Sequence, residues 1–422
     1  MLKNPKNGNM KRKIAVVVEY FPPRLGGDRR IFEIMNRLSD KYDVHFFIVP
    51  PSYTLFIRKI DKHAPEETPE LIHYAGMTGH NIGIPQYISK LWDKGFLLAF
   101  AVTMTYLTLQ LTKKIANLKP DIIIINQTSV YTGLLGFISS KALRRKLLVE
   151  YNDLQALYTF DMVQGKIPKN LQTLAKAVLM AQEDLIVKRG WRVIAITNFI
   201  KQYASDRKTR FDIKVIPDGV DTSSFNPSRF DRDEIRKKFN VRNTEKLCLY
   251  AGRIERVSGS GILVETAKLM ETQQNIKFMI VGEGNAELVN EFKKRKNTIC
   301  VGAVPKEEVP KYLAAADIVL VPFPKSIASH SISPLKLFEA LSMEKPVVAS
   351  NISGIEEVVQ SDFYGALVSD DPNHWALAIT KIANDNENLH QRRKNREIVV
   401  KKYDWALLAE QFSEIIEEKS DA

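Results

Sequence analysis

The hydrophobic positions in the first half of the chain fall into short continuous runs, each long enough for one strand. Five such runs cover residues 13–20, 44–49, 121–126, 147–153 and 192–197. Runs that are apolar at successive positions are typical of parallel strands with both faces covered. Between them, hydrophobic residues recur at helical spacing after residue 30 and within residues 130–143 and 168–189. Residues 50–91 show neither pattern, so we expect irregular structure there.

The second half repeats this alternation after a dense group of turn residues. The group consists of Pro217, Asp218, Gly219, Asp221 and Pro227. Turn residues this close together predict a hinge between two domains. Beyond the hinge, the patterns predict strands at residues 247–251, 276–281, 300–303, 318–322, 346–350 and 366–369. They predict helices at residues 261–271, 309–315, 334–343 and 403–419.

Regular alternation of strands and helices predicts an α/β fold of two doubly wound domains. Each domain would have a parallel sheet with right-handed crossovers. We place the first domain at residues 1–212 and the second at residues 213–402. The C-terminal helix, residues 403–422, is expected to join the first domain.

Charge narrows the class of partner more than composition does. The chain of 422 residues is 45% hydrophobic and 26% charged, which is ordinary for a soluble protein. Its net charge of +12 and pI near 9.3 are less ordinary. They favour acidic partners such as nucleotide phosphates, anionic lipid headgroups or nucleic acid.

The metal-binding residue types show no metal-site spacing. Cys248 and Cys300 both lie in apolar runs, so we interpret them as core residues in a reducing compartment. His63, His73 and His80 fall in the irregular region, and we interpret them as loop residues.

Two segments bear on membranes and targeting. The first thirteen residues are polar and basic without an apolar core, so we expect no signal peptide and a cytoplasmic protein. Residues 95–111 are apolar but short for a spanning helix. We interpret them as a core helix, with a helix face resting on lipid as the alternative.

Polar residues gather where strands of the first predicted sheet end. Gly26 and Gly27 follow the first strand and would let a ligand approach the backbone closely. Asn126 and Asp153 end two later strands. Ligands of open α/β sheets bind outside the carboxyl ends of strands, so these residues are candidates for lining a cleft. A tight turn at the glycines and helix capping by Asn and Asp are the alternatives.

One predicted helix carries an unusual charge at its start. Ser333 is a favourable N-cap and Pro334 suits the first helical position, so we expect the helix to begin there. Lys336 then lies in the first turn, where the helix dipole disfavours a cation unless an anion is bound opposite. We interpret the stretch as a phosphate cradle, with Glu339 one turn into the helix within reach. The alternative is a solvated lysine and a surface glutamate on an ordinary helix.

Six motifs spread over nearly the whole chain carry a family resemblance. They are the Gly26-Gly27 loop, IPDGVDTSSFNP, YAGRIE, FMIVGEGN, YLAAADIVLVPF and SPLKLFEALSMEKPVVAS. In this order and spacing they resemble the family-four glycosyltransferases, which share the two-domain architecture called GT-B. The resemblance implies two Rossmann-like domains facing a central cleft. The N-terminal domain would hold the acceptor and the C-terminal domain a nucleotide-diphospho-sugar.

The resemblance also implies roles for individual residues. Backbone amides at residues 333–335 would contact the diphosphate, Arg253 would neutralise it and Glu339 would hold the ribose. Arg253 suits this role physically, because it is a forked donor at the end of a strand. The implied donor-binding set is Gly27, Arg253, Gly282, Glu283, Ser331, Ser333, Pro334, Leu335, Lys336 and Glu339. The acceptor-side set is Gly26, Asn126 and Asp153, and the catalytic set is Arg253, Lys336, Glu339 and Asp153.

The chain departs from the family pattern at three positions. Ser331 stands where a first glutamate is usual, and Ser258 where a lysine is usual. Since a serine cannot supply charge, we hypothesise that Lys336 takes over the role of the missing cation. Asn126 replaces a histidine that often follows its strand.

The leading functional interpretation is transfer of a sugar from a nucleotide-diphospho-sugar to a lipid-linked or surface glycan acceptor, with retention of configuration. No Asp-x-Asp pair stands where a metal-dependent transferase needs one, so we expect neither metal nor cofactor. A further expected partner is an anionic membrane surface at the inner face of the cell membrane; nucleic acid is not expected. Alternatives are a catalytically degenerate homologue that binds a partner, and a nucleotide-sugar epimerase, against which the SPLKLFEAL stretch argues.

Overall fold

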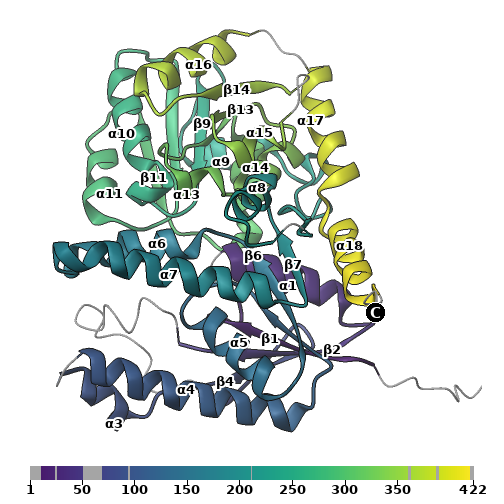
Figure 1. The fold of residues 1–422 in the computed structure, drawn as a ribbon. Coiled ribbons are helices and arrows are strands. Elements are labelled where there is room, and N and C mark those ends of the chain that lie inside the picture. Colours follow the sequence, from purple (N-terminus) through teal and green to yellow (C-terminus); the bar gives the residue numbers. More distant parts are fainter. Residues whose placement is uncertain are drawn as a thin grey trace, which may run out of the picture. The chain divides into compact units, whose positions relative to one another are not determined.

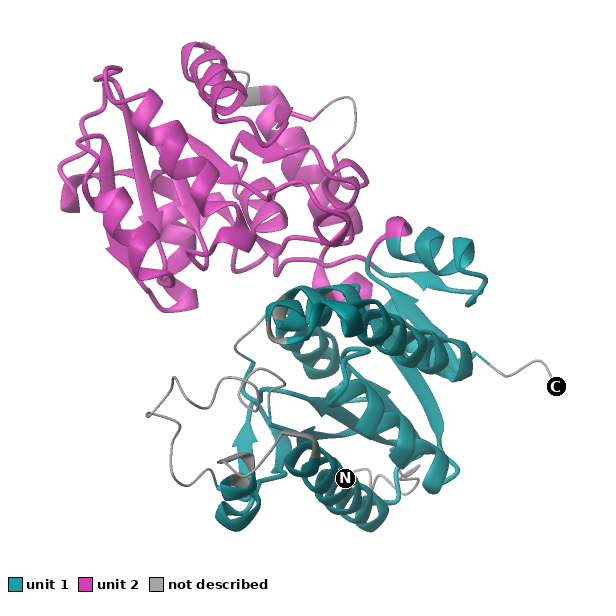
Figure 2. Ribbon diagram, turned by 60° about the vertical axis from the view of Figure 1, so that its left-hand side comes forward, with its two compact units in different colours: residues 1–196, 200–216, 409–422 teal, residues 197–199, 217–408 magenta. Residues whose placement is uncertain are grey.

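In the computed structural model, residues 11–23, 26–50, 69–93, 96–210, 212–359, 363–385 and 389–418 are described. The chain forms two compact units (Figure 2). Unit 1 comprises Met1–Ile196, Ile200–Ile216 and Ala409–Ala422, and unit 2 comprises Thr197–Phe199 and Pro217–Leu408. The change of unit after residue 216 comes at the predicted hinge, and the C-terminal helix begins in unit 2 and ends in unit 1.

Unit 1 is built on an eight-stranded sheet of order β3-β4-β2-β1-β5-β6-β7-β8 (Figure 1). Its strands are β1 (Lys13–Val18), β2 (Asp43–Ile48), β3 (Leu71–Tyr74), β4 (Met77–Asn81), β5 (Ile122–Ile125), β6 (Lys146–Tyr151), β7 (Arg192–Ala195) and β8 (Lys214–Val215). Its helices are α1 (Gly26–Leu38), α3 (Gln86–Ser89), α4 (Phe96–Leu118), α5 (Thr132–Ala142), α6 (Gln155–Val163), α7 (Lys169–Arg189) and most of α8 (Asn198–Asp206). The central strands β1 and β5 are buried along nearly their whole length, which explains their unbroken apolar sequence.

The expectation of irregular structure over residues 50–91 is wrong for its described part. β3 and β4 form an antiparallel hairpin, and β3 is therefore the exception in an otherwise parallel sheet. Ala75 and Gly76 make the turn with φ angles of 51° and 76°, the backbone of a two-residue turn that favours Asn-Gly. His73 and His80 lie in these strands and not in a loop, whereas His63 lies outside the described residues.

Helix α4 packs against α5 and β1 of unit 1 through one stripe of residues. The buried stripe repeats every fourth residue and consists of Ala99, Thr103, Leu107, Leu111 and Ile115. The interpretation of this apolar run as a core helix is confirmed along that stripe. Leu98 and Leu109 remain 61% and 64% exposed. Within the described part of the chain, we find no helix with enough length and apolar character to cross a membrane.

Unit 2 is built on a six-stranded parallel sheet of order β11-β10-β9-β12-β13-β14. Its strands are β9 (Lys246–Ala251), β10 (Ile276–Val281), β11 (Thr298–Gly302), β12 (Ile318–Val321), β13 (Val347–Ser350) and β14 (Gly365–Val368). Its helices are α9 (Arg232–Lys238), α10 (Ser260–Leu269), α11 (Ala286–Lys293), α12 (Val309–Ala315), α13 (Ile327–His330), α14 (Leu335–Ser342), α15 (Ser353–Glu356), α16 (Pro372–Asn384), α17 (Leu389–Lys402) and α18 (Trp405–Glu417), which continues into unit 1.

Helices cover both faces of this second sheet. Leu247 and Leu249 of β9 belong to one core with α9, α12 and α14. Cys248 and Tyr250, the alternate residues, belong to another core with α10, α11 and α16. Both cysteines are free thiols, as predicted, with Cys248 fully buried and Cys300 half-buried on β11.

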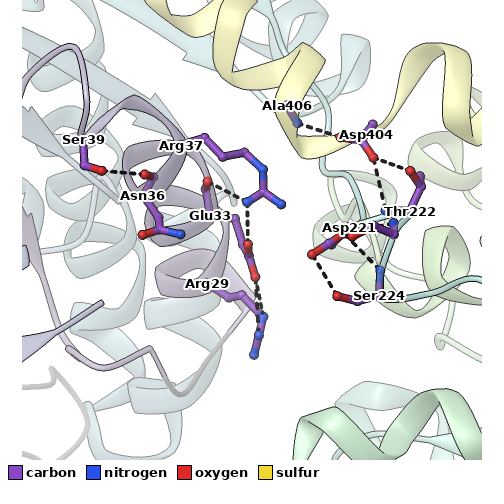
Figure 3. Close-up of polar contacts among 11 residues, drawn as sticks. Arg29, Glu33, Asn36, Arg37, Ser39, Asp221, Thr222, Ser224, Asp404 and Ala406 are labelled. Atoms are coloured by element: carbon purple, nitrogen blue, oxygen red, sulfur yellow. Dashed lines mark hydrogen bonds and ion pairs between the residues drawn. The ribbon is translucent and has the colours of Figure 1, made fainter. Parts of the chain in front are cut away.

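The hinge segment lies beside the start of α18 inside unit 2. Asp404 accepts hydrogen bonds from the amide and hydroxyl of Thr222 and, through its other oxygen, from the amide of Ala406 (Figure 3). Asp221 accepts from the amide and hydroxyl of Ser224, which closes the turn. A Cβ at Gly219 would lie 2.4 Å from the carbonyl oxygen of Tyr403, so only glycine fits between the two segments. In α1, Figure 3 also shows Glu33 between Arg29 and Arg37, pairs that bridge successive turns of the helix.

Candidate functional sites

In unit 2, the direction of strand order reverses between β9 and β12. From β9 the chain builds outwards through β10 and β11, and from β12 it builds the other way through β13 and β14. In open α/β sheets, ligands bind outside the carboxyl ends of the strands at such a reversal. The loop after β9 and the connection from β12 to α14 therefore define a candidate site, which we call the β9/β12 junction.

Glycines bring two loops of this junction into backbone contact. Gly252, with φ of 152°, follows β9 and donates its amide to the carbonyl of Val281 at 2.9 Å. Gly282 follows β10 with φ of 135°, and a Cβ there would lie 1.9 Å from the carbonyl oxygen of Gly252. This close approach explains the glycine at 282 without a ligand. Glu283, also in the predicted donor set, is exposed, and its carbonyl accepts the amide of Ile254 at 2.9 Å.

The start of α14 differs from the prediction. The structure has Pro334 at the N-cap and Leu335 as the first helical residue, without a side-chain cap. The hydroxyl of Ser333 instead accepts the amide of Asp218 at 3.3 Å. The predicted capping by Ser333 is therefore wrong, because the hinge segment uses that hydroxyl. The amide of Leu337 donates to the carbonyl of Pro334 at 2.9 Å, but no side chain caps the first turn of α14.

Lys336 lies in this first turn and is held by aromatic rings. Its Nζ is 4.5 Å from the centre of the Tyr250 ring and 5.1 Å from that of Phe323. It is also 3.4 Å from the Cβ position of Gly252, so it faces the loop after β9. Among the described residues, no carboxylate forms an ion pair with it. Ring faces attract a cation without neutralising it, so the junction keeps a positive charge.

Two further residues of the predicted donor set, Arg253 and Glu339, lie in the loop after β9 and in α14. Arg253 follows Gly252, and its guanidinium is exposed and 3.4 Å from the carboxylate of Glu255. The hydroxyl of Tyr250 donates to the carbonyl of Arg253 at 2.5 Å, which ties the arginine's backbone to the ring under Lys336. Glu339 is half-buried one turn further along α14.

The two serines at the departures from the family pattern each lie at the end of a short helix. Ser331 is buried, and its hydroxyl donates to the carbonyl of Ala328 at 2.7 Å. Ser258 is half-buried in a short 3₁₀ helix (Arg256–Ser258). The next residue, Gly259, has φ of 73° and a Cβ position 2.7 Å from Pro322.

Unit 1 has a reversal of the same kind between β1 and β5. Gly26 and Gly27 begin α1 after β1, and Asn126 follows β5, so the structure brings these three predicted residues to one place. The Cβ position of Gly27 lies 3.9 Å from Nδ2 of Asn126 and 3.7 Å from Nδ2 of Asn152. We call this place the β1/β5 junction. Asp153 lies one residue beyond Asn152, and its carboxylate contacts Gln155 at 3.5 Å.

The β1/β5 junction also contains a buried carboxyl that sequence reasoning missed. Asp28, in the first turn of α1, is 1% exposed and accepts a hydrogen bond from Nδ2 of Asn126 at 3.0 Å. Burial, and secondly the charge of Glu19, raise the pKa of Asp28 to about 7. The sequence contained a signal for this carboxyl, because Glu19 directly follows β1 and Asp28 directly follows the two glycines.

Histidines pair elsewhere in unit 1. Nδ1 of His45 and Nε2 of His80 are 3.0 Å apart, and Nε2 of His45 is 3.1 Å from Asp43. Burial, and secondly His45, lower the pKa of His80 to about 4. The described residues contain no group of three or more His, Cys, Asp or Glu side chains that could hold a metal ion.

Comparisons with known families match both halves of the chain. The model "Glycosyltransferase Family 4" matches residues 25–224, and "Glycosyl transferases group 1" matches residues 231–398. The lipopolysaccharide 1,2-N-acetylglucosaminetransferase of Salmonella typhimurium is 25% identical over 238 residues, which are 53% of this chain and 61% of that protein. The chain spans less than two thirds of the length of such relatives, from 40% to 61% for three of them.

Solved structures share the fold. Sucrose-phosphate synthase from Thermosynechococcus elongatus gives a TM-score of 0.74 at 20% identity, covering 96% of this chain and 98% of that one. Anabaena Alr3699/HepE, solved in complex with UDP and glucose, gives 0.72 at 16% identity, covering 97% and 100%. At these identities the likeness establishes the architecture, two parallel-sheet α/β domains of the GT-B type.

Proposed function

Because the chain belongs to the family-four, group 1 glycosyltransferases, we propose that it transfers a sugar from a nucleotide-diphospho-sugar to a glycan acceptor. The donor's diphosphate would bind at the β9/β12 junction of unit 2. The observation that carries this proposal is Lys336, a cation without a carboxylate partner among the described residues, at the uncapped N-terminus of α14. A bound diphosphate would interact with both the lysine and the amides at the start of the helix.

Charge stabilisation is the main task of such a site. During transfer, the bond between the anomeric carbon and the diphosphate oxygen breaks, and a bond to the acceptor oxygen forms. Negative charge then grows on the departing nucleoside diphosphate. Fixed positive groups stabilise that charge without reorganising, so Lys336 and Arg253 would supply what a metal ion supplies in other transferases. We therefore propose a metal-independent reaction, with retention of configuration as the family resemblance implies.

The acceptor is proposed to be a lipid-linked or surface glycan. The Salmonella relative is named for lipopolysaccharide, and GT-B structures such as HepE contain UDP and glucose. Unit 1 exposes large apolar side chains on two helices, Leu98 and Leu109 on α4 and Leu174 on α7. Together with a net charge of +12, these favour contact with an anionic membrane that carries such acceptors.

A ligand screen followed by variants tests the donor site. Thermal unfolding in EDTA with a panel of nucleotides and nucleotide sugars should reveal the donor, since a ligand that binds only the folded state raises its stability. Lys336→Met keeps the apolar stem over the rings but removes the charge, and we expect it to weaken donor binding about tenfold or more. Lys336→Arg should retain part of the affinity. Lys268→Ala, an exposed lysine on α10, is the control.

Equal donor affinity in Lys336→Met and the parent protein would reject the assigned role of the lysine. Product analysis separates the remaining possibilities. Transfer or hydrolysis of the sugar supports the transferase, whereas a C2-inverted sugar still attached to its nucleotide would identify an epimerase. Activity that appears only when Mg²⁺ replaces EDTA would reject metal independence.

A further inference from the structure

Helix α7, which packs against α6 and β6 in unit 1, buries an acid (Figure 1). Glu183 is 2% exposed and is one of three buried residues of the helix, beside the apolar Ile186 and Val187. No basic side chain among the described residues forms an ion pair with it. A buried carboxylate without a cation is costly unless hydrogen-bond donors surround it. The donors around Glu183 therefore indicate what this acid does.

Three neutral donors bind the carboxylate of Glu183, and each comes from a different segment. The hydroxyl of Thr128 and the amide of Ala156 donate to Oε2 at 2.9 and 3.0 Å. The hydroxyl of Tyr151 donates to Oε1 at 2.9 Å. Thr128 lies in the loop after β5, Tyr151 ends β6, and Ala156 lies in the first turn of α6. One side chain of α7 therefore holds the carboxyl ends of two neighbouring strands.

The loop after β5 is attached to α7 through both side chain and backbone. Besides the hydroxyl contact with Glu183, the carbonyl of Thr128 accepts from Nε2 of Gln182 at 3.0 Å. Asn126 lies two residues earlier in this loop, and its own carbonyl accepts from Nδ2 of Asn152 at 2.7 Å. The course of the loop that presents Asn126 therefore depends on α7 and on the end of β6.

The loop after β6 is held on both sides of Asp153. Tyr151, two residues before it, and Ala156, three residues after it, both donate to Glu183. Within the loop, the carbonyl of Asp153 accepts the amide of Gln155 at 2.9 Å. The position of Asp153 therefore depends on the same buried carboxylate as the loop that presents Asn126.

The neighbouring acid of α7 makes a different kind of contact. Asp184 is half-buried, pairs with the guanidinium of Arg207 and accepts from the hydroxyl of Thr209 at 3.0 Å. Arg207 directly follows α8, and neither partner belongs to the loops after β5 and β6. Asp184 therefore attaches α7 to the end of α8 and contacts none of the predicted site residues, which makes it a matched comparison for Glu183.

We propose that Glu183 is a positioning residue for sugar transfer, which holds the loops after β5 and β6 so that Asn126 and Asp153 face the acceptor in the reactive geometry. The inference rests on the proposed function, which places the acceptor on these loops. Glu183 is buried and acts only through its three donors, so it contacts no substrate itself. Small displacements of residues that orient a substrate lower turnover strongly, because the reacting atoms are no longer aligned.

Release of nucleotide from the donor found in the ligand screen tests this role in the full-length protein. The acceptors are water and the octyl glycosides of glucose, galactose, mannose and N-acetylglucosamine. We expect Glu183→Ala to lower kcat about tenfold or more. Its dissociation constant for the donor should stay within about twofold of the parent value, because the diphosphate is proposed to bind in unit 2.

Three further variants separate positioning from folding. Glu183→Gln keeps an acceptor oxygen for Thr128 and Ala156, and its amide can donate to the hydroxyl of Tyr151, so it should recover most of the lost kcat. Thr128→Val removes one hydroxyl at nearly constant volume and should lower kcat by about threefold without preventing folding. Asp184→Ala should lower the midpoint of urea unfolding and leave kcat unchanged, because its partners lie outside the two loops.

The outcomes distinguish this role from the proposed function. A parent protein that releases nucleotide while Glu183→Ala does so at the same kcat would overturn the positioning role alone. An equal loss of kcat in Asp184→Ala, or no recovery in Glu183→Gln, would also overturn it and leave Glu183 as a structural residue. A parent protein that neither binds nor cleaves any nucleotide sugar would reject the proposed function and, with it, the role of Glu183 in transfer.

Discussion

The buried carboxyl of Asp28 should contribute to the pH dependence of the free energy of unfolding. Its pKa is raised from 3.8 to about 7 by burial and then by Glu19. Between these values the folded state holds a proton that the unfolded chain has released, so the free energy of unfolding falls as the pH rises through this window. At about 1.4 kcal/mol per pK unit, the loss is at most about 4 kcal/mol.

Asp28→Asn should remove this dependence. The amide keeps an acceptor for Asn126 and carries no charge, so we expect the variant to gain stability relative to the parent protein as the pH rises from 5 to 8. Urea unfolding at each pH measures the difference. Asp40→Asn, at an exposed aspartate beyond α1, is the control. A difference between variant and parent that stays constant with pH would contradict the raised pKa.

Sequence reasoning reached the residues whose signal is local and missed those that depend on distant partners. Lys336 stood out because its charge conflicts with its own helix. Its aromatic contacts, Tyr250 and Phe323, come from another strand and another loop, which no local pattern connects. Ser333 was misassigned for the same reason, since the amide that uses its hydroxyl belongs to Asp218 in the hinge.

At the scale of elements, buried strands were predictable and exposed ones were not. β10 and α12 match their predicted limits, because apolar runs and turn residues define them. The hairpin of β3 and β4 was missed because β3 has only four residues and is mostly exposed, and because Ala75 stands where its turn favours asparagine. Helix α16 was not predicted, although its start has a sequence signal. Asp371 is a favourable N-cap and accepts the amide of Asn373, and Pro372 is the first helical residue.

Asp404 links the start of α18 to the hinge segment. Its two oxygens accept the amide and hydroxyl of Thr222 and the amide of Ala406 (Figure 3). Asp404→Ala should therefore lower the free energy of unfolding by about 2–4 kcal/mol, through the loss of a cap and of two further hydrogen bonds. Urea denaturation measures this loss.

Two further variants separate the contributions of Asp404 to stability. Asp404→Asn retains acceptor oxygen and should cost less than the alanine variant. Asp371→Ala removes a cap that serves α16 alone, so we expect about 1 kcal/mol. If the two alanine variants cost the same, the bonds between Asp404 and the hinge contribute nothing to stability.

At the scale of the whole molecule, net charge and exposed apolar side chains act together. Helix α7 exposes Leu171, Leu174 and Val178 at 46%, 62% and 58%, spaced so that they share one side of the helix. Lys169 and Lys176 of the same helix are also exposed. A helix with apolar and basic residues exposed together can bind an anionic bilayer, where apolar burial and electrostatic attraction add.

Co-sedimentation with vesicles of phosphatidylcholine and phosphatidylglycerol tests this surface. We expect binding at low salt that weakens at high salt, since added ions screen the attraction between lysines and headgroups. Leu171→Gln with Leu174→Gln should weaken binding about tenfold or more at either salt concentration, because two leucine side chains no longer enter the lipid boundary. Leu377→Gln, at a leucine of α16 that is 68% exposed in unit 2, should bind like the parent protein. Absence of binding at low salt would reject the membrane proposal and, because the proposed donor site lies in unit 2, would leave the donor proposal intact.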